Sequence, residues 1–151
     1  MAKNKSEGKG RYQDYLNTIH SKFETPEEII SSAVSKAVNS SIAQKKRLIK
    51  GEANEVYDVE TQSGRELIIR ISREEVWLPY EGEKWATDRC LEADIPVPKI
   101  LSIEHLSLDG KPLHVCVETK LPGTPLNELE AKGGISTTGR RNILKQVGSL
   151  L

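Results

Sequence analysis

The sequence has little of what disulfide-stabilised or membrane proteins need. Its 151 residues include only two cysteines, Cys90 and Cys116, which lie far apart and form no C-x-x-C pair. We therefore expect two thiols in a reducing compartment, and no disulfide or metal site. No apolar run approaches the roughly 18–20 residues of a membrane span. No apolar signal core follows the basic N-terminus, so we expect a cytoplasmic protein.

An excess of charge of one sign is also missing. Lys plus Arg and Asp plus Glu both number 22, so the formal net charge is zero. This balance argues against nucleic acid or a membrane surface as the main partner. With 36% hydrophobic and 29% charged residues, the composition allows a modest core inside a well-solvated surface.

The first 44 residues predict a part of the chain that precedes the strands. Residues 1–10 are rich in Lys, Gly, Ser and Glu and predict a disordered tail. Residues 11–44 predict a helical N-terminal extension, with a weak helical pattern followed by a second helix that has Thr25 as its N-cap. The apolar stripe over residues 29–38 is expected to pack on the rest of the domain, and a partner-binding helix is the alternative.

After this part, short strands with tight turns dominate. Five strands are predicted, over residues 47–50, 55–60, 67–71, 99–104 and 113–119. A helix is predicted over residues 79–93, between the third and fourth strands, and another from about Thr137. Five antiparallel strands with one helix packed on a face make an α+β arrangement.

Three features follow one another in an order that suits phosphoryl transfer. That chemistry needs the triphosphate held in line and its charge neutralised more than it needs covalent help from the protein. A turn between two strands, small enough to cover phosphates, is formed by Gly51, Glu52, Ala53 and Asn54. Arg70 is a cation within an aliphatic strand, and Glu83 lies on the next helix, with Glu81 as a second candidate. Each feature alone is ordinary, and their order makes the combination informative.

Four runs of sequence look like motifs of one enzyme family. Residues 51–57 read G-E-A-N-E-V-Y, residues 67–71 read L-I-I-R-I, and residues 95–98 read I-P-V-P. Residues 115–126 read V-C-V-E-T-K-L-P-G-T-P-L. In this order they resemble the aminoglycoside phosphotransferase family, which is related to choline and homoserine kinases and shares the protein-kinase fold. In that family Arg often stands where protein kinases have the strand Lys, and Glu83 matches the helix Glu.

The resemblance covers about residues 45–151. It implies a kinase-like, nucleotide-binding N-terminal lobe over residues 45–119, then a hinge and the start of a second lobe over residues 120–151. The backbone of the hinge would meet the adenine ring of ATP, or the base of GTP. By the resemblance, the hinge residues are Glu118, Thr119, Lys120 and Leu121. The walls of the adenine pocket would be Val56, Ile68 and Val117.

The resemblance also implies a phosphate acceptor, which would be a small hydroxylated molecule. An aminoglycoside, choline, a sugar, a macrolide or an amino alcohol are the alternatives for this acceptor. Two departures from the kinase pattern stand out: the loop has a single Gly, and Arg at position 70 differs in geometry from Lys.

The family's catalytic loop, H-G-D-x-x-x-x-N, is missing from this sequence. The three histidines are followed by Ser21, Leu106 and Val115. We expect a truncated reading frame that ends within a helix and lacks the catalytic base and the metal ligands. Mg²⁺ would then bind only with the family's second lobe, and the chain alone would show no turnover.

Two alternatives to an enzyme lobe remain. One is a non-catalytic module that binds a nucleotide or a partner, and the other is an interaction domain that uses residues 29–38. We also expect the last helix to leave an apolar face exposed, so that the chain self-associates. That face comprises Ile143, Leu144, Val147, Leu150 and Leu151.

Overall fold

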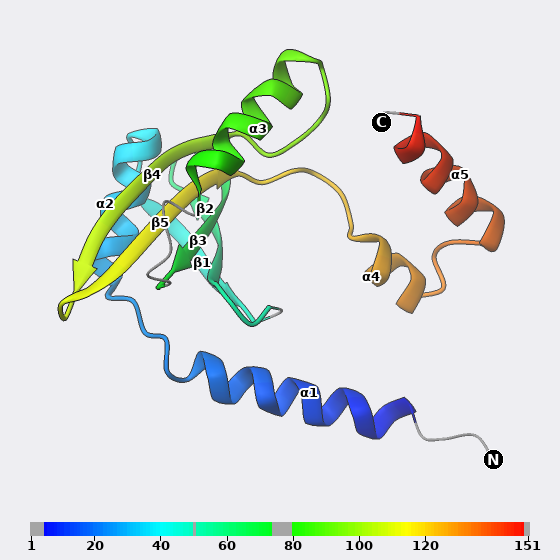
Figure 1. The fold of residues 1–151 in the computed structure, drawn as a ribbon, viewed down its shortest axis with the longest axis horizontal. Helices are drawn as coiled ribbons and strands as arrows, with labels where there is room; N and C mark the ends of the chain where they lie inside the picture. The colour runs from blue at the N-terminus through cyan, green and yellow to red at the C-terminus, as the bar shows by residue number, and fades with distance from the viewer. Residues whose placement is uncertain (1–4, 50, 74–79, 150–151) are drawn as a thin grey trace.

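A five-stranded antiparallel sheet organises the chain (Figure 1). The structure is a computed structural model that describes residues 5–49, 51–73 and 80–149. Its strands are β1 (Ile42–Leu48), β2 (Glu55–Thr61), β3 (Glu66–Ser72), β4 (Ile100–Leu108) and β5 (Lys111–Thr119). Their order in the sheet is β1-β2-β3-β5-β4, so the β4–β5 hairpin adds to β3 through β5. The predicted α+β class with five antiparallel strands is confirmed.

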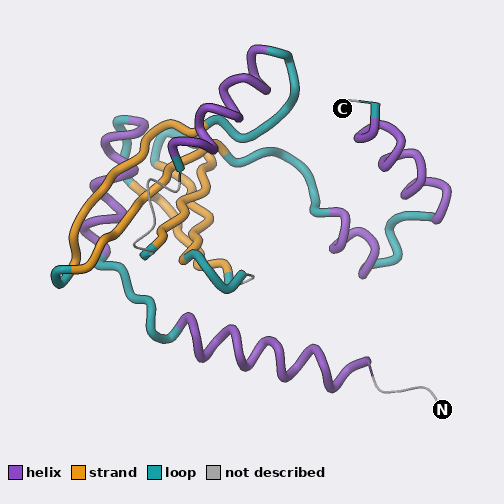
Figure 2. The backbone as a smooth tube through the Cα atoms, viewed as in Figure 1, coloured by secondary structure: helices purple, strands orange, loops and turns teal. Residues whose placement is uncertain are grey.

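Five helices accompany the sheet in the described residues. They are α1 (Lys5–His20), α2 (Glu27–Val38), α3 (Glu81–Glu92), α4 (Leu126–Ala131) and α5 (Thr137–Gly148). Helix α1 includes residues 5–10, which the composition predicts as part of a disordered tail, whereas residues 1–4 lie outside the described residues. The short helix α4 was not predicted. Figure 2 shows the loop that leads from β5 to α4 and α5.

Helix α2 covers one face of the sheet. Ile30, Ala33 and Val34 are buried, and they pack in one cluster with β2, β3 and β5. The packing interpretation of the apolar stripe is therefore confirmed. Strand β1 begins at Ile42, so the predicted extension over residues 11–44 contains both a core helix and the start of the sheet.

The predicted N-cap of α2 is wrong. Pro26 occupies the N-cap position and makes no side-chain capping bond. Thr25 instead donates a hydrogen bond from Oγ1 to Glu55 Oε2 at 2.8 Å. A buried carboxylate needs hydrogen-bond donors more than a helix end needs a cap, because helix ends can be satisfied by water.

The side chains of β2, β3 and β5 alternate between two different faces. On β3, Leu67, Ile69 and Ile71 are fully buried beneath α2, while Ile68 and Arg70 are half-buried on the other face. This alternation follows from the two-residue period of a strand. We call the side covered by α2 the closed face and the side that carries Arg70 the open face.

Some predicted boundaries fall outside the described residues or shift. The first strand was predicted over residues 47–50, but β1 starts five residues earlier, and Lys50 lies outside the described part. Pro79, predicted at the first turn of the third helix, also lies outside it. Among the described residues, no helix has the length and apolar character needed to cross a membrane.

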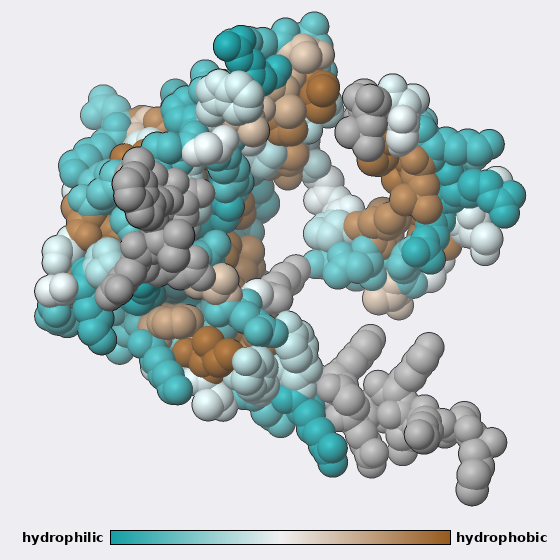
Figure 3. Space-filling view, viewed as in Figure 1, coloured by the Kyte–Doolittle hydropathy of each residue, from teal (hydrophilic) through white to brown (hydrophobic). Residues whose placement is uncertain are grey.

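Helix α5 carries apolar side chains at its surface. Leu144 and Val147 are 55% and 52% exposed, and Figure 3 shows apolar surface on the C-terminal helical part. The expected exposure is confirmed for these two residues, whereas Ile143 is half-buried and Leu150 and Leu151 lie outside the described residues. Self-association through this face stays a prediction.

Candidate functional site

Arg70 lies at the centre of the open face. Strand β3 places it opposite Val56 of β2 and Cys116 of β5. Its Nη2 donates to Glu83 Oε1 on α3 at 2.8 Å and to Glu118 Oε2 on β5 at 3.0 Å. The structure therefore brings together Arg70 and Glu83, as their order in the sequence predicts.

Glu81, the second candidate on α3, has a different partner. Its Oε1 lies 2.5 Å from Nε2 of His105 on β4. His105 in turn lies with its Nδ1 2.7 Å from Nδ1 of His114 on β5. Glu83 is therefore the carboxylate that holds Arg70, while Glu81 belongs to a histidine cluster on the β4–β5 hairpin.

The environment of Arg70 keeps its guanidinium charged. Burial alone would lower the pKa of Arg70, but the hydrogen bond to Glu83 and the charge of Glu118 outweigh it and raise that pKa. The guanidinium also stacks on Tyr80, with Cζ 5.1 Å from the ring centroid. Arg70 Nε is buried and has no hydrogen-bond partner among the described residues.

The acidic partner on β5 is less well compensated. Burial raises the pKa of Glu118; Arg70 opposes this effect and the nearby Glu83 adds to it. Burial likewise raises the pKa of the neighbouring Cys116 thiol to about 11, so the thiol is neutral at physiological pH. Arg70 thus lies between two carboxylates, and the pKa of Glu118 is raised despite this cation.

The predicted phosphate-covering turn lies between β1 and β2. Open space surrounds Gly51 where a Cβ would project, and Glu52 and Ala53 are exposed while Asn54 is half-buried. Helix α1 reaches this turn at two points, through His20 to the Gly51 carbonyl and through Tyr12 to the Glu52 carboxylate. Sequence reasoning missed both contacts, because a weak helical pattern carries no signal of what the helix touches.

The three residues predicted to line an adenine pocket separate into two groups. Val56 pairs with Arg70, and Ile68 pairs with Glu118, so both lie on the open face. Val117 is fully buried on the closed face, in the cluster beneath α2. The structure does not bring Val117 to Arg70, and this corrects the expectation. Because Cys116 and Glu118 face Arg70, the residue between them must point away.

The predicted hinge is already engaged by the sheet along most of its length. The Thr119 N–H donates to the Lys99 carbonyl at 3.0 Å, and the Lys120 N–H donates to the Glu66 carbonyl at 3.2 Å. The Leu121 backbone makes no hydrogen bond to any described residue, and its side chain is 45% exposed. Among the predicted hinge residues, Leu121 is therefore the one whose backbone has no hydrogen-bond partner in the described residues.

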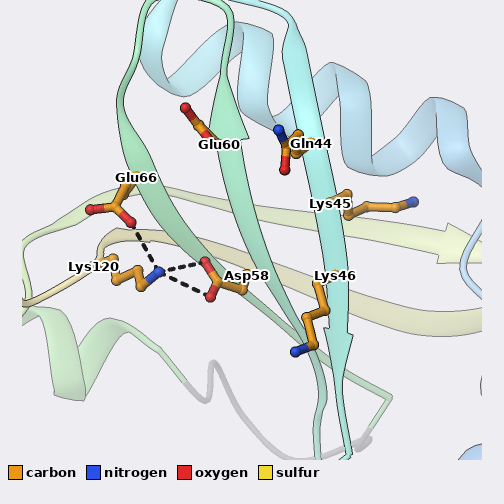
Figure 4. A pocket seen from close by; sticks show the side chains of 7 residues that line it. All are labelled: Gln44, Lys45, Lys46, Asp58, Glu60, Glu66 and Lys120. Atoms are coloured by element: carbon orange, nitrogen blue, oxygen red, sulfur yellow. Dashed lines mark hydrogen bonds and ion pairs between the residues drawn. The ribbon is translucent and has the colours of Figure 1, made fainter. Parts of the chain in front are cut away.

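The side chain of Lys120 reaches back over the open face. Its Nζ lies 3.0 Å from both carboxylate oxygens of Asp58 and from Glu66 Oε1 (Figure 4). These groups form one wall of a polar pocket at the β1 side of the open face. The pocket is lined by Gln44, Lys45, Lys46, Asp58, Glu60, Glu66 and Lys120. Lys120 therefore acts as an ion-pair partner at the rim of this face.

The fold and this site define an α+β domain with a strand-to-helix ion pair on the open face of its sheet. No protein-family model matches the chain, and no curated protein matches it. Within residues 5–49, 51–73 and 80–149, no group of three or more His, Cys, Asp or Glu side chains is arranged to hold a metal ion.

Proposed function

We propose that this chain is the nucleotide-binding lobe of a cytoplasmic phosphotransferase that uses ATP or GTP and phosphorylates a small hydroxylated molecule. The observation that carries the proposal is the 2.8 Å ion pair between Arg70 on β3 and Glu83 on α3. Kinases use the same relationship, in which a carboxylate on the helix after the third strand holds the phosphate-binding cation of that strand.

The chemistry of Arg70 suits a triphosphate. A guanidinium presents five donors in one plane, so it can bind a phosphate oxygen while Glu83 keeps its hydrogen bond to Nη2. Val56 and Ile68 supply apolar surface on the same face, and the Leu121 backbone is the remaining hinge group for the base.

Transfer of the phosphoryl group needs more than this chain contains. No histidine in the sequence is followed by Gly-Asp, so the proposal has no catalytic base here. Mg²⁺ would be held mainly by the family's second lobe. We therefore propose that the chain binds the nucleotide, and that acceptor binding and turnover require that second lobe.

Calorimetric titration of the chain with ATP and with GTP tests the proposal. Arg70→Met should weaken binding by about ten- to hundredfold, the value of losing charge-assisted hydrogen bonds, and Glu83→Gln should cause a smaller loss. Arg65→Met is the matched control, because Arg65 is exposed on the β2–β3 turn away from the site. Nucleotide binding that is absent, or that Arg65→Met and Arg70→Met weaken equally, would contradict the proposal.

A second candidate is a nucleotide- or partner-binding module without turnover. The observation that favours it is the pair of carboxylates that already occupies Arg70 Nη2, which competes with phosphate. An intact, longer protein that binds nucleotide but never transfers phosphate to any hydroxylated acceptor would select this function.

A further inference from the structure

The last residue of helix α1, His20, contacts Gly51, the first residue of the phosphate-covering turn. His20 Nε2 lies 2.6 Å from the carbonyl oxygen of Gly51, thirty-one positions away in the chain. The His20 side chain is only 1% exposed, so the contact is shielded from water. A second contact joins Tyr12 to the Glu52 carboxylate at 3.0 Å, but Tyr12 is 49% exposed. The buried histidine is therefore the stronger of the two.

The surroundings of His20 require one tautomer of its ring. A carbonyl oxygen can only accept, so Nε2 must carry the proton that is donated to Gly51. On the other side, Arg47 Nη2, which can only donate, lies 3.5 Å from Nδ1 and donates to the His20 carbonyl at 2.9 Å. The ring also packs edge-on against Phe23 at 5.8 Å between centroids. The imidazole is thus held in a single orientation.

We propose that His20 is a positioning residue for the nucleotide turn, holding Gly51 so that the turn is ordered before a phosphate arrives. The inference rests on the proposed function. Ordering backbone on binding weakens affinity, by about five- to thirtyfold for each residue that must be fixed. A turn anchored at its first residue avoids part of that loss. Helix α1 then belongs to the nucleotide site, because its last residue, His20, contacts the turn.

Two substitutions of His20 separate its hydrogen bond from its packing. His20→Gln keeps an N–H donor and loses the ring, whereas His20→Phe keeps a ring against Phe23 and loses the donor. Calorimetry of the full chain should measure the affinity for ATP and for adenosine, which lacks the phosphates that the turn covers. Thermal unfolding of each variant reports whether the fold survives.

We expect His20→Phe to weaken ATP binding by about five- to thirtyfold, with adenosine binding unchanged and His20→Gln close to wild type. Tyr12→Phe, at the exposed contact, should change ATP binding less than His20→Phe. If His20→Phe unfolds, His20→Leu repeats the test without the donor.

Three results would overturn the inference in distinguishable ways. Equal ATP affinity in the wild type and His20→Phe removes the positioning role while the proposed function stands. A packing role predicts the reverse order of the two variants, with adenosine and ATP affinities falling together with thermal stability. A wild-type chain that binds no nucleotide ends the proposed function, and the inference with it.

Discussion

Two buried carboxylates on opposite faces of the sheet differ in the hydrogen-bond donors that surround them. On the closed face, Glu55 is fully buried and accepts hydrogen bonds from Thr25 Oγ1 and Arg73 Nη1, both at 2.8 Å, and from the Tyr57 hydroxyl. On the open face, Glu118 is 8% exposed and accepts from Arg70 Nη2, which donates to Glu83 as well. Glu55 therefore has several hydrogen-bond donors, whereas Glu118 has the Arg70 guanidinium, which it shares with Glu83.

The pKa directions of the two groups follow from that difference. Burial alone would raise the pKa of Glu55, but hydrogen bonds from Tyr57, Arg73 and Thr25 bring it below its usual value of 4.5. The pKa of Glu118 stays raised, because Arg70 does not offset burial and the charge of Glu83. On the closed face, Glu55 is thus held by several donors that stabilise its charge. The open face leaves a weakly compensated carboxylate beside a cation, where an anionic ligand can compete.

The largest expected effect is on the free energy of unfolding, and it distinguishes the two faces of the sheet at neighbouring positions of β3. Ile69 is fully buried beneath α2, whereas its neighbour Ile68 is half-buried on the open face. Ile69→Ala should lower the free energy of unfolding by about 2–5 kcal/mol, the usual result of a large-to-small core change. Ile68→Ala should cost less than half as much and mainly weaken nucleotide binding. Denaturant unfolding of both variants provides the measurement, and equal losses would break the comparison.

The next effect compares the two carboxylates directly. Glu55→Gln leaves the 23%-exposed Arg73 guanidinium without its ionised partner, and should cost about 2 kcal/mol at neutral pH. Because the folded pKa of Glu55 is lowered, its stabilisation is present above the unfolded value of 4.5 and lost as the pH falls through the folded pKa. The difference between the wild type and the variant should therefore shrink below pH 4.5 in denaturant unfolding.

Glu118→Gln is the matched counterpart and should behave in the opposite sense. A raised folded pKa contributes stability below the unfolded value of 4.5, and this stability is lost as the pH rises through the folded pKa. The free energy of unfolding of the variant should therefore rise relative to that of the wild type as the pH rises above 4.5. At neutral pH the two free energies should differ by less than about 1 kcal/mol. A loss as large as that of Glu55→Gln would show that both carboxylates are equally well satisfied.

Local sequence patterns could predict the sheet and the central ion pair. Aliphatic residues between tight turns predicted β2 to β5, but only the last two residues of β1. The order of a strand Arg before a helical Glu predicted the pair between Arg70 and Glu83. The face of each residue was less secure, because shifting a strand's phase by one position moves a side chain to the other side of the sheet. The family resemblance implies that Val117 lines a pocket with Val56 and Ile68, whereas Cys116 is the residue of that part of β5 that faces Arg70.

The rest of the structure depends on contacts between distant residues. Gln44 and Lys46 give β1 little strand character, and the segment is held by its pairing with β2. Thr25 looks like a helix cap until Glu55, thirty residues away, is seen to require its hydroxyl. The contact between His20 and Gly51 has the same character. Such interactions are set by tertiary packing, which no local pattern encodes.

The smallest expected effect lies at the rim of the open face. Lys120 bridges Asp58 and Glu66, but its side chain is 34% exposed and that of Glu66 is 62% exposed (Figure 4). Exposed ion pairs are screened by water and salt, so Lys120→Met should lower the free energy of unfolding by less than about 1 kcal/mol. The loss should vanish at high salt, whereas the loss in Glu55→Gln should persist there because that pair is buried. Nucleotide affinity should be unchanged, since the Lys120 side chain pairs with Asp58 and Glu66 and its backbone N–H is held by the Glu66 carbonyl. A salt-resistant loss of stability would show that the ion pairs of Lys120 are shielded as well as that of Glu55. Weaker ATP binding in Lys120→Met would instead make this lysine a ligand-binding side chain of the open face.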